Sequence, residues 1–245
     1  MKSRVDFIGI PLDNISMSET LYRIDQAIIS KKQIHHCVIN AGKVVKMQSD
    51  KVLMESVVNS DIINADGMSV VWAARFLGHK IKERVAGIDL MENLVRLAYE
   101  KSYSCFFLGA KQEVLEKLVR DYSAKYSKNV IAGFRNGYFH EKDEKEIIKK
   151  IKESNADFLF VAITSPKKEI FLNKYKHELK NINLIMGVGG SFDVISGEVK
   201  RAPLFMQKIG LEWFYRFAQE PGRMWRRYLI GNIKFMIIVF KARFL

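Results

Sequence analysis

The stretch 61-DIINADGMSVVWAARFLG-78 decides the fold class of this chain. Its first half is a short apolar run typical of a buried strand, and its second half has the spacing of an amphipathic helix. Between the two halves stands one carboxylate, Asp66, which is followed directly by Gly67. A strand that passes into a helix through a short turn is the repeating unit of α/β proteins. Asp66 is therefore expected at the carboxyl end of a strand, beside a residue that allows close backbone approach.

The same alternation of strand-like and helical patterns continues along the chain. Ser16 and Glu19 have the spacing of a capping box at the start of a helix. Near-continuous apolar strands that alternate with helices are typical of a parallel sheet covered on both faces. We predict a Rossmann-like, mostly parallel α/β sheet over residues 1–200, followed by a helical appendage over residues 201–245. The expected strands are VDFIGI (5–10), HHCVIN (35–40), DIIN (61–64), SCFFLG (104–109), NVIAGF (129–134), DFLFVAI (157–163) and NLIMGVG (183–189).

Composition indicates a folded, intracellular protein. Of the 245 residues, 48% are hydrophobic and 27% are charged, which favours a globular chain over a disordered or polytopic one. The two cysteines, Cys37 and Cys105, lie in apolar runs and are predicted to be reduced core thiols. The N-terminal apolar run is broken by Asp6 and Pro11, so a signal peptide is not expected.

Positive charge is concentrated at the C-terminal end. The net charge is +13, and residues 201–245 contain nine basic residues against two acidic ones. Such an excess predicts an anionic partner, which can be nucleic acid, an acidic membrane surface or a phosphorylated substrate. Basic and aromatic residues alternate in this segment, as in helices that lie at a membrane interface. Lys234 and Lys241 interrupt its last apolar run, which is therefore too short to span a bilayer. Nucleic-acid binding would tolerate this composition, but no reading motif accompanies it.

The strand-to-helix turns predict a ligand with nucleotide-like charge. In parallel sheets ligands bind beyond the carboxyl ends of the strands, and helix N-termini there attract phosphate. The sequence GVGGSF places Phe192 where a dinucleotide fingerprint needs glycine, and a Walker A loop is missing. An Asp-x-Asp pair and a histidine cluster are missing too, so neither a metal ion nor another cofactor is expected. Arginine, lysine and helix dipoles would then neutralise a departing diphosphate.

Five motifs stand out, which are NADGMSVVWAARFLG (64–78), ERVAGIDL (83–90), SPKKE (165–169), GVGGSFDVISGEVKRAP (187–203) and LEWFYRFAQEPGRMWRRYLIGN (211–232). Together they closely resemble motifs of the bacterial WecG/TagA/CpsF glycosyltransferases. The resemblance extends from about residue 38 to 232 and implies an inverting transferase, which the missing Asp-x-Asp pair and histidine cluster predict to be metal-independent. It implies transfer of a sugar from a UDP donor to a polyprenyl-diphosphate-linked, N-acetylglucosamine-type acceptor in cell-surface polysaccharide synthesis. It also implies a peripheral enzyme at the cytoplasmic face of the bacterial inner membrane, with an anionic membrane surface and no nucleic acid as partner.

The sequence leaves alternatives open for the donor sugar and for the class of protein. N-acetylmannosamine and N-acetylmannosaminuronic acid are the favoured sugars, with a UDP-glucose-type donor as the alternative within the family. Outside it, the alternative is a non-catalytic nucleotide- or nucleic-acid-binding α/β protein. Homo-oligomerisation is left open.

The resemblance also implies roles for individual residues. Asp66 would be the base that takes the proton from the acceptor hydroxyl, with the N-cap of the following helix as its alternative role. Arg84 would contact an anion, with a salt bridge to Glu83 or another acid as its alternative. In ITSPKKE, Thr164 and Lys168 replace the glycine and glutamine that the family usually carries. The expected substrate-binding residues are Asn40, Gly67, Arg84, Gly109, Ser165, Lys168, Glu169, Gly189, Asp193, Arg216, Arg223 and Arg226.

Overall fold

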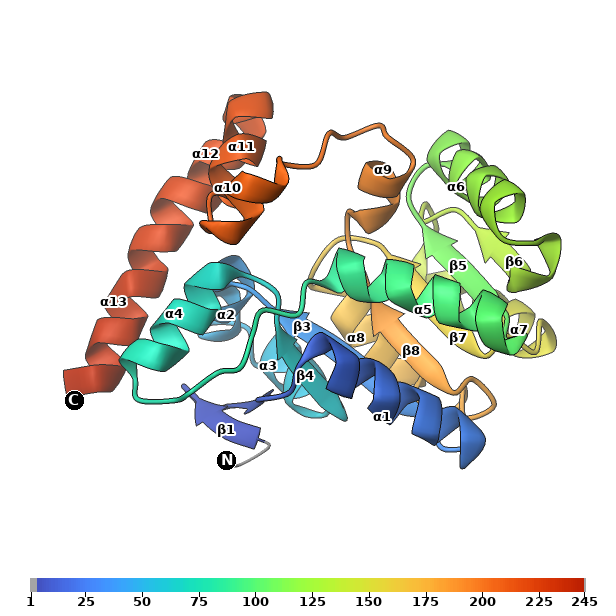
Figure 1. Ribbon diagram of the computed structural model, residues 1–245, viewed down its shortest axis with the longest axis horizontal. Helices are drawn as coiled ribbons and strands as arrows, with labels where there is room; N and C mark the ends of the chain where they lie inside the picture. Colours follow the sequence, from blue (N-terminus) through green and yellow to red (C-terminus); the bar gives the residue numbers. More distant parts are fainter. Residues whose placement is uncertain (1–3, 245) are drawn as a thin grey trace.

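Within residues 4–244, six parallel strands form the centre of the molecule (Figure 1). The computed structural model describes these residues, except for the side chains of Arg223, Met224, Arg226 and Arg227. All neighbouring strands of the sheet pair in parallel, which confirms the predicted architecture. In spatial order they are β4 (Ile62–Ala65), β3 (Ile34–Ile39), β8 (Leu184–Gly187), β7 (Phe158–Ala162), β5 (Cys105–Gly109) and β6 (Ile131–Arg135).

Helices cover both faces of this sheet. On one face α1 (Met17–Ile29), α5 (Gly87–Lys101), α6 (Gln112–Lys125) and α9 (Ser191–Ile195) pack over one hydrophobic cluster. Its centre includes Phe107, Phe158 and Phe160, which are fully buried, and each buried ring contributes roughly 2–3 kcal/mol. The Ser16–Glu19 capping box at the start of α1 is confirmed.

The opposite face is divided into two clusters. The first lies under α2 (Ala41–Met47), α3 (Lys51–Val58) and α4 (Met68–Phe76), beside β3 and β4. The second lies under α7 (Glu144–Glu153) and α8 (Lys167–Tyr175), beside β5 and β7. Of the two short 3₁₀ segments, η2 (Glu141–Asp143) precedes α7, and η1 (Lys128–Val130) packs with α5 and α6 on the first face. Both cysteines are buried and free, as predicted.

The N-terminal strand prediction is wrong. Residues 5–10 do not form one strand of the parallel sheet but contribute to a separate hairpin of β1 (Arg4–Phe7) and β2 (Ile10–Asp13). Ile8 and Gly9 form the turn with φ values of 56° and 76°. Two successive positive φ angles give the backbone twist of a two-residue hairpin turn. The Asp6 carboxylate accepts a hydrogen bond from the Gly9 amide at 2.8 Å and holds this turn.

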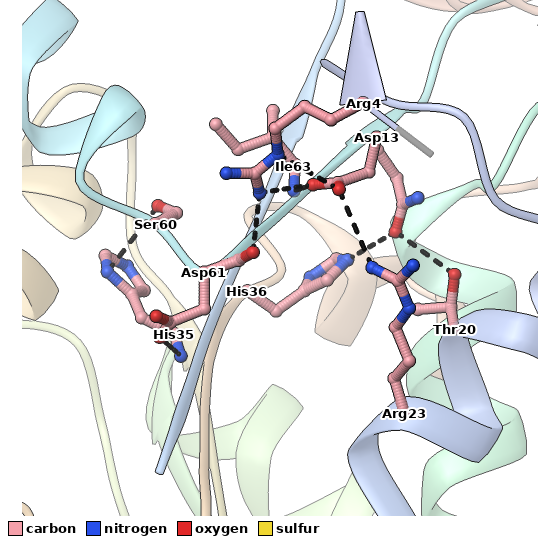
Figure 2. Close-up of polar contacts among 10 residues, drawn as sticks. Arg4, Asp13, Thr20, Arg23, His35, His36, Ser60, Asp61 and Ile63 are labelled. Carbon is pink, nitrogen blue, oxygen red and sulfur yellow. Dashed lines mark hydrogen bonds and ion pairs between the residues drawn. The ribbon is translucent and has the colours of Figure 1, made fainter. Parts of the chain in front are cut away.

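A buried carboxylate fastens the hairpin to the edge of the sheet (Figure 2). Asp13 accepts two hydrogen bonds from the Arg4 guanidinium, at 3.1 and 2.6 Å, and one from the Ile63 amide of β4 at 2.8 Å. Arg4 also donates to the Asp61 carbonyl oxygen at 2.6 Å, and the Asp61 carboxylate accepts from the His35 amide at 2.7 Å. Because an edge strand otherwise presents unpaired backbone groups, these contacts fix β4 immediately before Asp66.

A helical segment follows the sheet and returns to it. Its elements are α10 (Leu204–Lys208), α11 (Glu212–Gln219), α12 (Pro221–Trp225), a π-helical turn η3 (Arg226–Ile230) and α13 (Gly231–Phe244). Phe235 and Val239 of α13 are buried in the same cluster as α2 and α4, and Figure 1 shows α13 running beside these helices. The Phe76 and Phe240 rings meet edge to face at 5.5 Å. No helix within residues 4–244 is long and apolar enough to cross a membrane.

The start of this segment contacts α4 closely. Gly210 has a φ of 72° and lies against the ring of Trp72. A Cβ atom at residue 210 would be 2.5 Å from a Trp72 ring atom, so only glycine fits this position without movement. The helical segment is therefore anchored to the helix that follows Asp66.

Candidate active site

A wide cleft opens at the carboxyl ends of the central strands. It has a volume of about 2730 Å³ and is closed on one side by residues of α11, η3 and α13. This is the place where an open parallel sheet is expected to bind its ligand. The cleft brings together most of the predicted residues, which are Asn40, Asp66, Gly67, Arg84, Ser165, Lys168, Gly189, Asp193 and Arg216.

Four predicted residues are not among those that line the cleft. Gly109 and Glu169 are described by the structure but do not line the cleft. The side chains of Arg223 and Arg226 lie outside the described part of the structure. A Cβ atom at Gly109 would be 2.5 Å from the carbonyl carbon of Ala162. This glycine is therefore required where β5 passes close to β7, and its contribution to the cleft is indirect.

Asp66 is held at the cleft by two backbone contacts. Its amide donates to the Ile39 carbonyl oxygen at 2.9 Å, which ties the end of β4 to β3. Its Oδ1 atom accepts a hydrogen bond from the Gly87 amide, at the first residue of α5, at 2.9 Å. Within residues 4–244 the second oxygen, Oδ2, has no hydrogen-bond partner. The carboxylate is therefore oriented by one oxygen and keeps the other for a ligand.

The alternative role of Asp66 as the N-cap of α4 is not what the structure shows. Gly67 is the N-cap residue of α4, and it makes no side-chain capping bond. Asp66 instead accepts from the N-terminus of α5, whose own N-cap residue, Ala86, has no capping side chain. The carboxylate thus satisfies a free amide of a different helix, at the positive end of its dipole.

Asn40 lies next to Asp66 across the strand ends. It is the N-cap residue of α2, and its Oδ1 atom accepts from the Lys43 amide at 3.1 Å. A Cβ atom at Gly67 would be 3.6 Å from the Asn40 Cβ. The missing side chain of Gly67 thus allows the Asn40 and Asp66 turns to pack together. Asn40 lines the cleft, and its capping contact uses only the side-chain oxygen.

A buried cluster of three charged residues, Lys43, Lys168 and Glu169, joins α2 to α8. The Nζ atoms of both lysines contact Oε1 of Glu169, at 2.7 Å for Lys43 and 2.6 Å for Lys168. Burial alone would raise the pKa of Glu169, but the charges of Lys43 and Lys168 lower it to about 2. Burial and the charge of Lys43 lower the pKa of Lys168. Burial also opposes the charge of Lys43, yet the neighbouring groups Cys37 and Glu169 outweigh it and raise the Lys43 pKa.

Sequence reasoning missed Lys43. This lysine lies in the first turn of α2 among apolar residues. Its apolar surroundings were the only sign in the sequence that it is buried. A lysine inside an apolar run usually needs a buried partner, but the partner, Glu169, is far away in sequence. Both lysines of the cluster line the cleft.

Arg84 reaches from the loop before α5 to the C-terminal helical segment. Its guanidinium contacts Glu212 of α11 at 3.0 Å and donates to the Gln207 carbonyl oxygen at 3.3 Å. Glu212 also lies 3.7 Å from the guanidinium of Arg216. Arg84 therefore has the salt bridge that sequence analysis gave as its alternative, with Glu212 as the acid. Two arginines that line the cleft share one carboxylate of α11.

The remaining predicted residues form the rim of the cleft. Ser165 is exposed just before α8, while Gly189 has a φ of 57° and precedes α9. Asp193 lies in the first turn of α9. A Cβ atom at Gly187 would be 3.1 Å from Cδ of Lys168, so this glycine makes room for the lysine stem on β8. Among residues 4–244, no group of three or more His, Cys, Asp or Glu side chains is arranged to hold a metal ion.

Comparisons with known proteins agree with the motifs. A family model described as "Glycosyl transferase WecG/TagA/CpsF family" matches residues 5–245. Two curated relatives carry the name N-acetylglucosaminyldiphosphoundecaprenol N-acetyl-beta-D-mannosaminyltransferase. The one from Bacillus subtilis (strain 168) is 37% identical over 192 residues, which cover 78% of this chain and 73% of the relative. The one from Bacillus spizizenii (strain ATCC 23059 / NRRL B-14472 / W23) is 40% identical over 176 residues, which cover 71% and 67%.

Proposed function

We propose that this chain, which belongs to the WecG/TagA/CpsF family of glycosyltransferases, transfers N-acetylmannosamine from a UDP donor to N-acetylglucosaminyl-diphosphoundecaprenol. The names of both relatives contain this sugar and this acceptor. One structural observation supports the proposal most. A carboxylate oriented by a helix N-terminus, Asp66, lies in the same cleft as two arginines able to bind a diphosphate.

In the proposed reaction Asp66 is the general base. Its free Oδ2 takes the proton from the acceptor hydroxyl while the hydroxyl oxygen attacks the anomeric carbon of the donor sugar. The bond from the anomeric carbon to the diphosphate oxygen breaks, and its electron pair leaves with UDP. Attack opposite the leaving group inverts the anomeric configuration.

Arg84 and Arg216 would stabilise the departing diphosphate. Guanidinium groups bind phosphate oxygens in pairs, and both of these arginines line the cleft. Arg223 and Arg226 are proposed to join them from the same helical segment. Positive side chains would then provide the neutralisation that a metal ion supplies in other transferases, which is the basis for proposing a metal-independent mechanism.

The C-terminal helices are proposed to dock on the cytoplasmic face of the inner membrane. The acceptor is a lipid, so its diphosphate lies at a membrane surface. Large apolar side chains of this segment are exposed, while basic residues accompany them, as in interfacial helices. The exposed apolar residues include Leu204, Phe205, Ile233, Met236, Ile237, Phe240 and Phe244.

The donor is the least constrained part of the proposal. N-acetylmannosaminuronic acid and glucose stay as alternative sugars, and the names of the relatives favour N-acetylmannosamine. A panel of UDP-sugars offered with N-acetylglucosaminyl-diphosphate lipid in membrane vesicles distinguishes them. The assay contains EDTA, so that turnover also tests independence from divalent metal.

The matched variants are Asp66→Asn and Asp121→Asn, the second at an exposed position on α6. We expect Asp66→Asn to lower kcat by about 10²–10⁴-fold, the usual contribution of a general base, and Asp121→Asn to have no effect. Equal thermal melting of both variants and the wild type shows that the fold is intact. If Asp66→Asn retains activity within about tenfold, the carboxylate serves only as the cap of α5.

A further inference from the structure

The buried charge cluster holds more positive than negative charge. Among the described side chains, two ammonium groups share one carboxylate oxygen of Glu169. The side chains of Lys43, Glu169 and Lys168 are only 5%, 3% and 8% exposed. Burying a charge without a partner is costly, and two cations with a single anion leave one charge unmatched. A folded chain that keeps this excess at a ligand cleft has a use for it.

The two lysines of the cluster are not equivalent. Lys43 Nζ also donates to the Val38 carbonyl oxygen at 2.6 Å and lies 3.6 Å from Sγ of Cys37. In the described part of the chain, the Nζ atom of Lys168 has Glu169 as its only ionic or hydrogen-bond partner. Because an ammonium group has three donors, Lys168 keeps donors that the protein does not use. Lys43 is therefore the structural cation of the pair and Lys168 the available one.

The fold makes room for Lys168 at the cleft. Its stem lies on β8 against Gly187, where any larger residue would bring a Cβ atom to 3.1 Å from Cδ. The side chain lines the cleft, whereas the carboxylate that holds it, Glu169, does not. Glu169 and Gly187 thus hold Lys168 in place at the wall of the cleft.

We propose that Lys43, Glu169 and Lys168 form an anion subsite in which Lys168 receives an anionic oxygen of the donor substrate. This inference rests on the proposed use of a nucleotide-sugar donor. The oxygen can belong to the diphosphate or to a carboxylate on the transferred sugar. In both cases Glu169 positions Lys168, and the excess charge of the cluster is used when the anion is bound.

The decisive variant is Lys168→Gln, because glutamine has a similar length and leaves Lys43 and Glu169 as a balanced pair. Removing one of two like charges from a buried site should raise thermal stability if the excess charge is retained for function. A lysine with a purely structural role would give the opposite result, a lower melting temperature. Lys180→Gln is the matched control, since Lys180 is exposed after α8 and away from the cleft.

Binding is measured by calorimetry with UMP, UDP, UDP-N-acetylglucosamine and UDP-glucuronic acid as probes. We expect Lys168→Gln to lower the affinity for at least one anionic probe by about tenfold, the loss typical of one charge-assisted contact. Lys180→Gln should bind every probe with the wild-type affinity. A loss for UDP and both UDP-sugars, but not for UMP, assigns the contact to the second phosphate. A loss confined to UDP-glucuronic acid assigns it to the sugar carboxylate.

Binding of every probe within twofold of the wild type in folded Lys168→Gln protein overturns the inference. If the melting temperature of that variant is also lower, the cluster serves the structure alone. If the wild type binds none of the nucleotides, the proposed UDP donor is wrong. Inorganic diphosphate then tests the subsite by itself, and an affinity that is equal in wild type and Lys168→Gln refutes it.

Discussion

Mild acid should destabilise this protein through two adjacent buried histidines on β3. Burial lowers the pKa of His36 to about 4 and that of His35 to about 3, from an ordinary value of 6.5. The positive charge of Lys176 lowers the pKa of His35 further. At His36 the hydrogen bond with Asn64 raises the pKa, but it offsets only part of the effect of burial. Both histidines are therefore neutral in the folded state at a pH where the unfolded chain already takes up protons.

The sign and size of the effect follow from proton linkage. The folded pKa values lie below the unfolded value, so the unfolded state binds more protons between about pH 6.5 and pH 3. The stability is complete above the unfolded pKa and is lost as the pH falls toward the folded pKa. Between about pH 7 and pH 5 each histidine should remove about 2 kcal/mol, or about 4 kcal/mol together. Glu169 has a lowered pKa of about 2. The stability that this lowered pKa contributes is lost only below the ordinary glutamate value of 4.5, which lies outside this interval.

Urea denaturation followed by tryptophan fluorescence at several pH values measures this loss. The variants His35→Gln and His36→Gln should each reduce the drop between about pH 7 and pH 5 by about 2 kcal/mol. This holds even if a variant is less stable at neutral pH, because the readout is the slope. His177→Gln, at an exposed position, should keep the wild-type slope. If both β3 variants lose as much stability in acid as the wild type, the histidines are protonated in the folded state and the reasoning is wrong.

Three further changes test the cleft and its surroundings. Gly109→Ala places a Cβ atom 2.5 Å from Ala162 at a φ of 140°, so it should remove at least ~2 kcal/mol of stability in urea denaturation; a loss below ~0.5 kcal/mol would show that β5 and β7 can separate there. Glu212→Gln releases Arg84 from its 3.0 Å carboxylate contact and should tighten UDP binding about threefold to tenfold in calorimetry. Weaker binding would instead mean that the carboxylate positions the arginine. Phe76→Ala removes two edge-to-face ring contacts with α13, worth about 1–2 kcal/mol, and should speed hydrogen exchange in α13; unchanged exchange would assign the docking to Phe235 and Val239.

Local patterns were sufficient to locate the cleft. The alternation of strands and helices placed Asn40, Asp66, Ser165 and Gly189 at strand ends, and a parallel sheet brings such ends together at one edge. Their common position required only the fold class. The use of each residue in the reaction is a different question, which the resemblance suggests and the proposed variants test.

Long-range contacts explain what the sequence did not reveal. Ile8 adopts a positive φ that its side chain disfavours, so the run around it had the pattern of one strand although it contains a turn. Lys43 has Glu169 as its buried partner, a pairing that appears only once α2 and α8 are packed together. Similarly, Glu212 could not be identified as the partner of Arg84, because the path of the helical segment back to the cleft is a tertiary property.

The strand order has a consequence for synthesis on the ribosome. β8 pairs with β3 on one side and with β7 on the other, so it joins two half-sheets that come from earlier parts of the chain. Domains emerge N-terminal end first, and therefore β3 and β7 leave the ribosome with one edge of each unpaired. The nascent protein has no cleft until β8 is inserted, and in that interval the exposed edges of β3 and β7 are available to chaperones or to pairing with other chains.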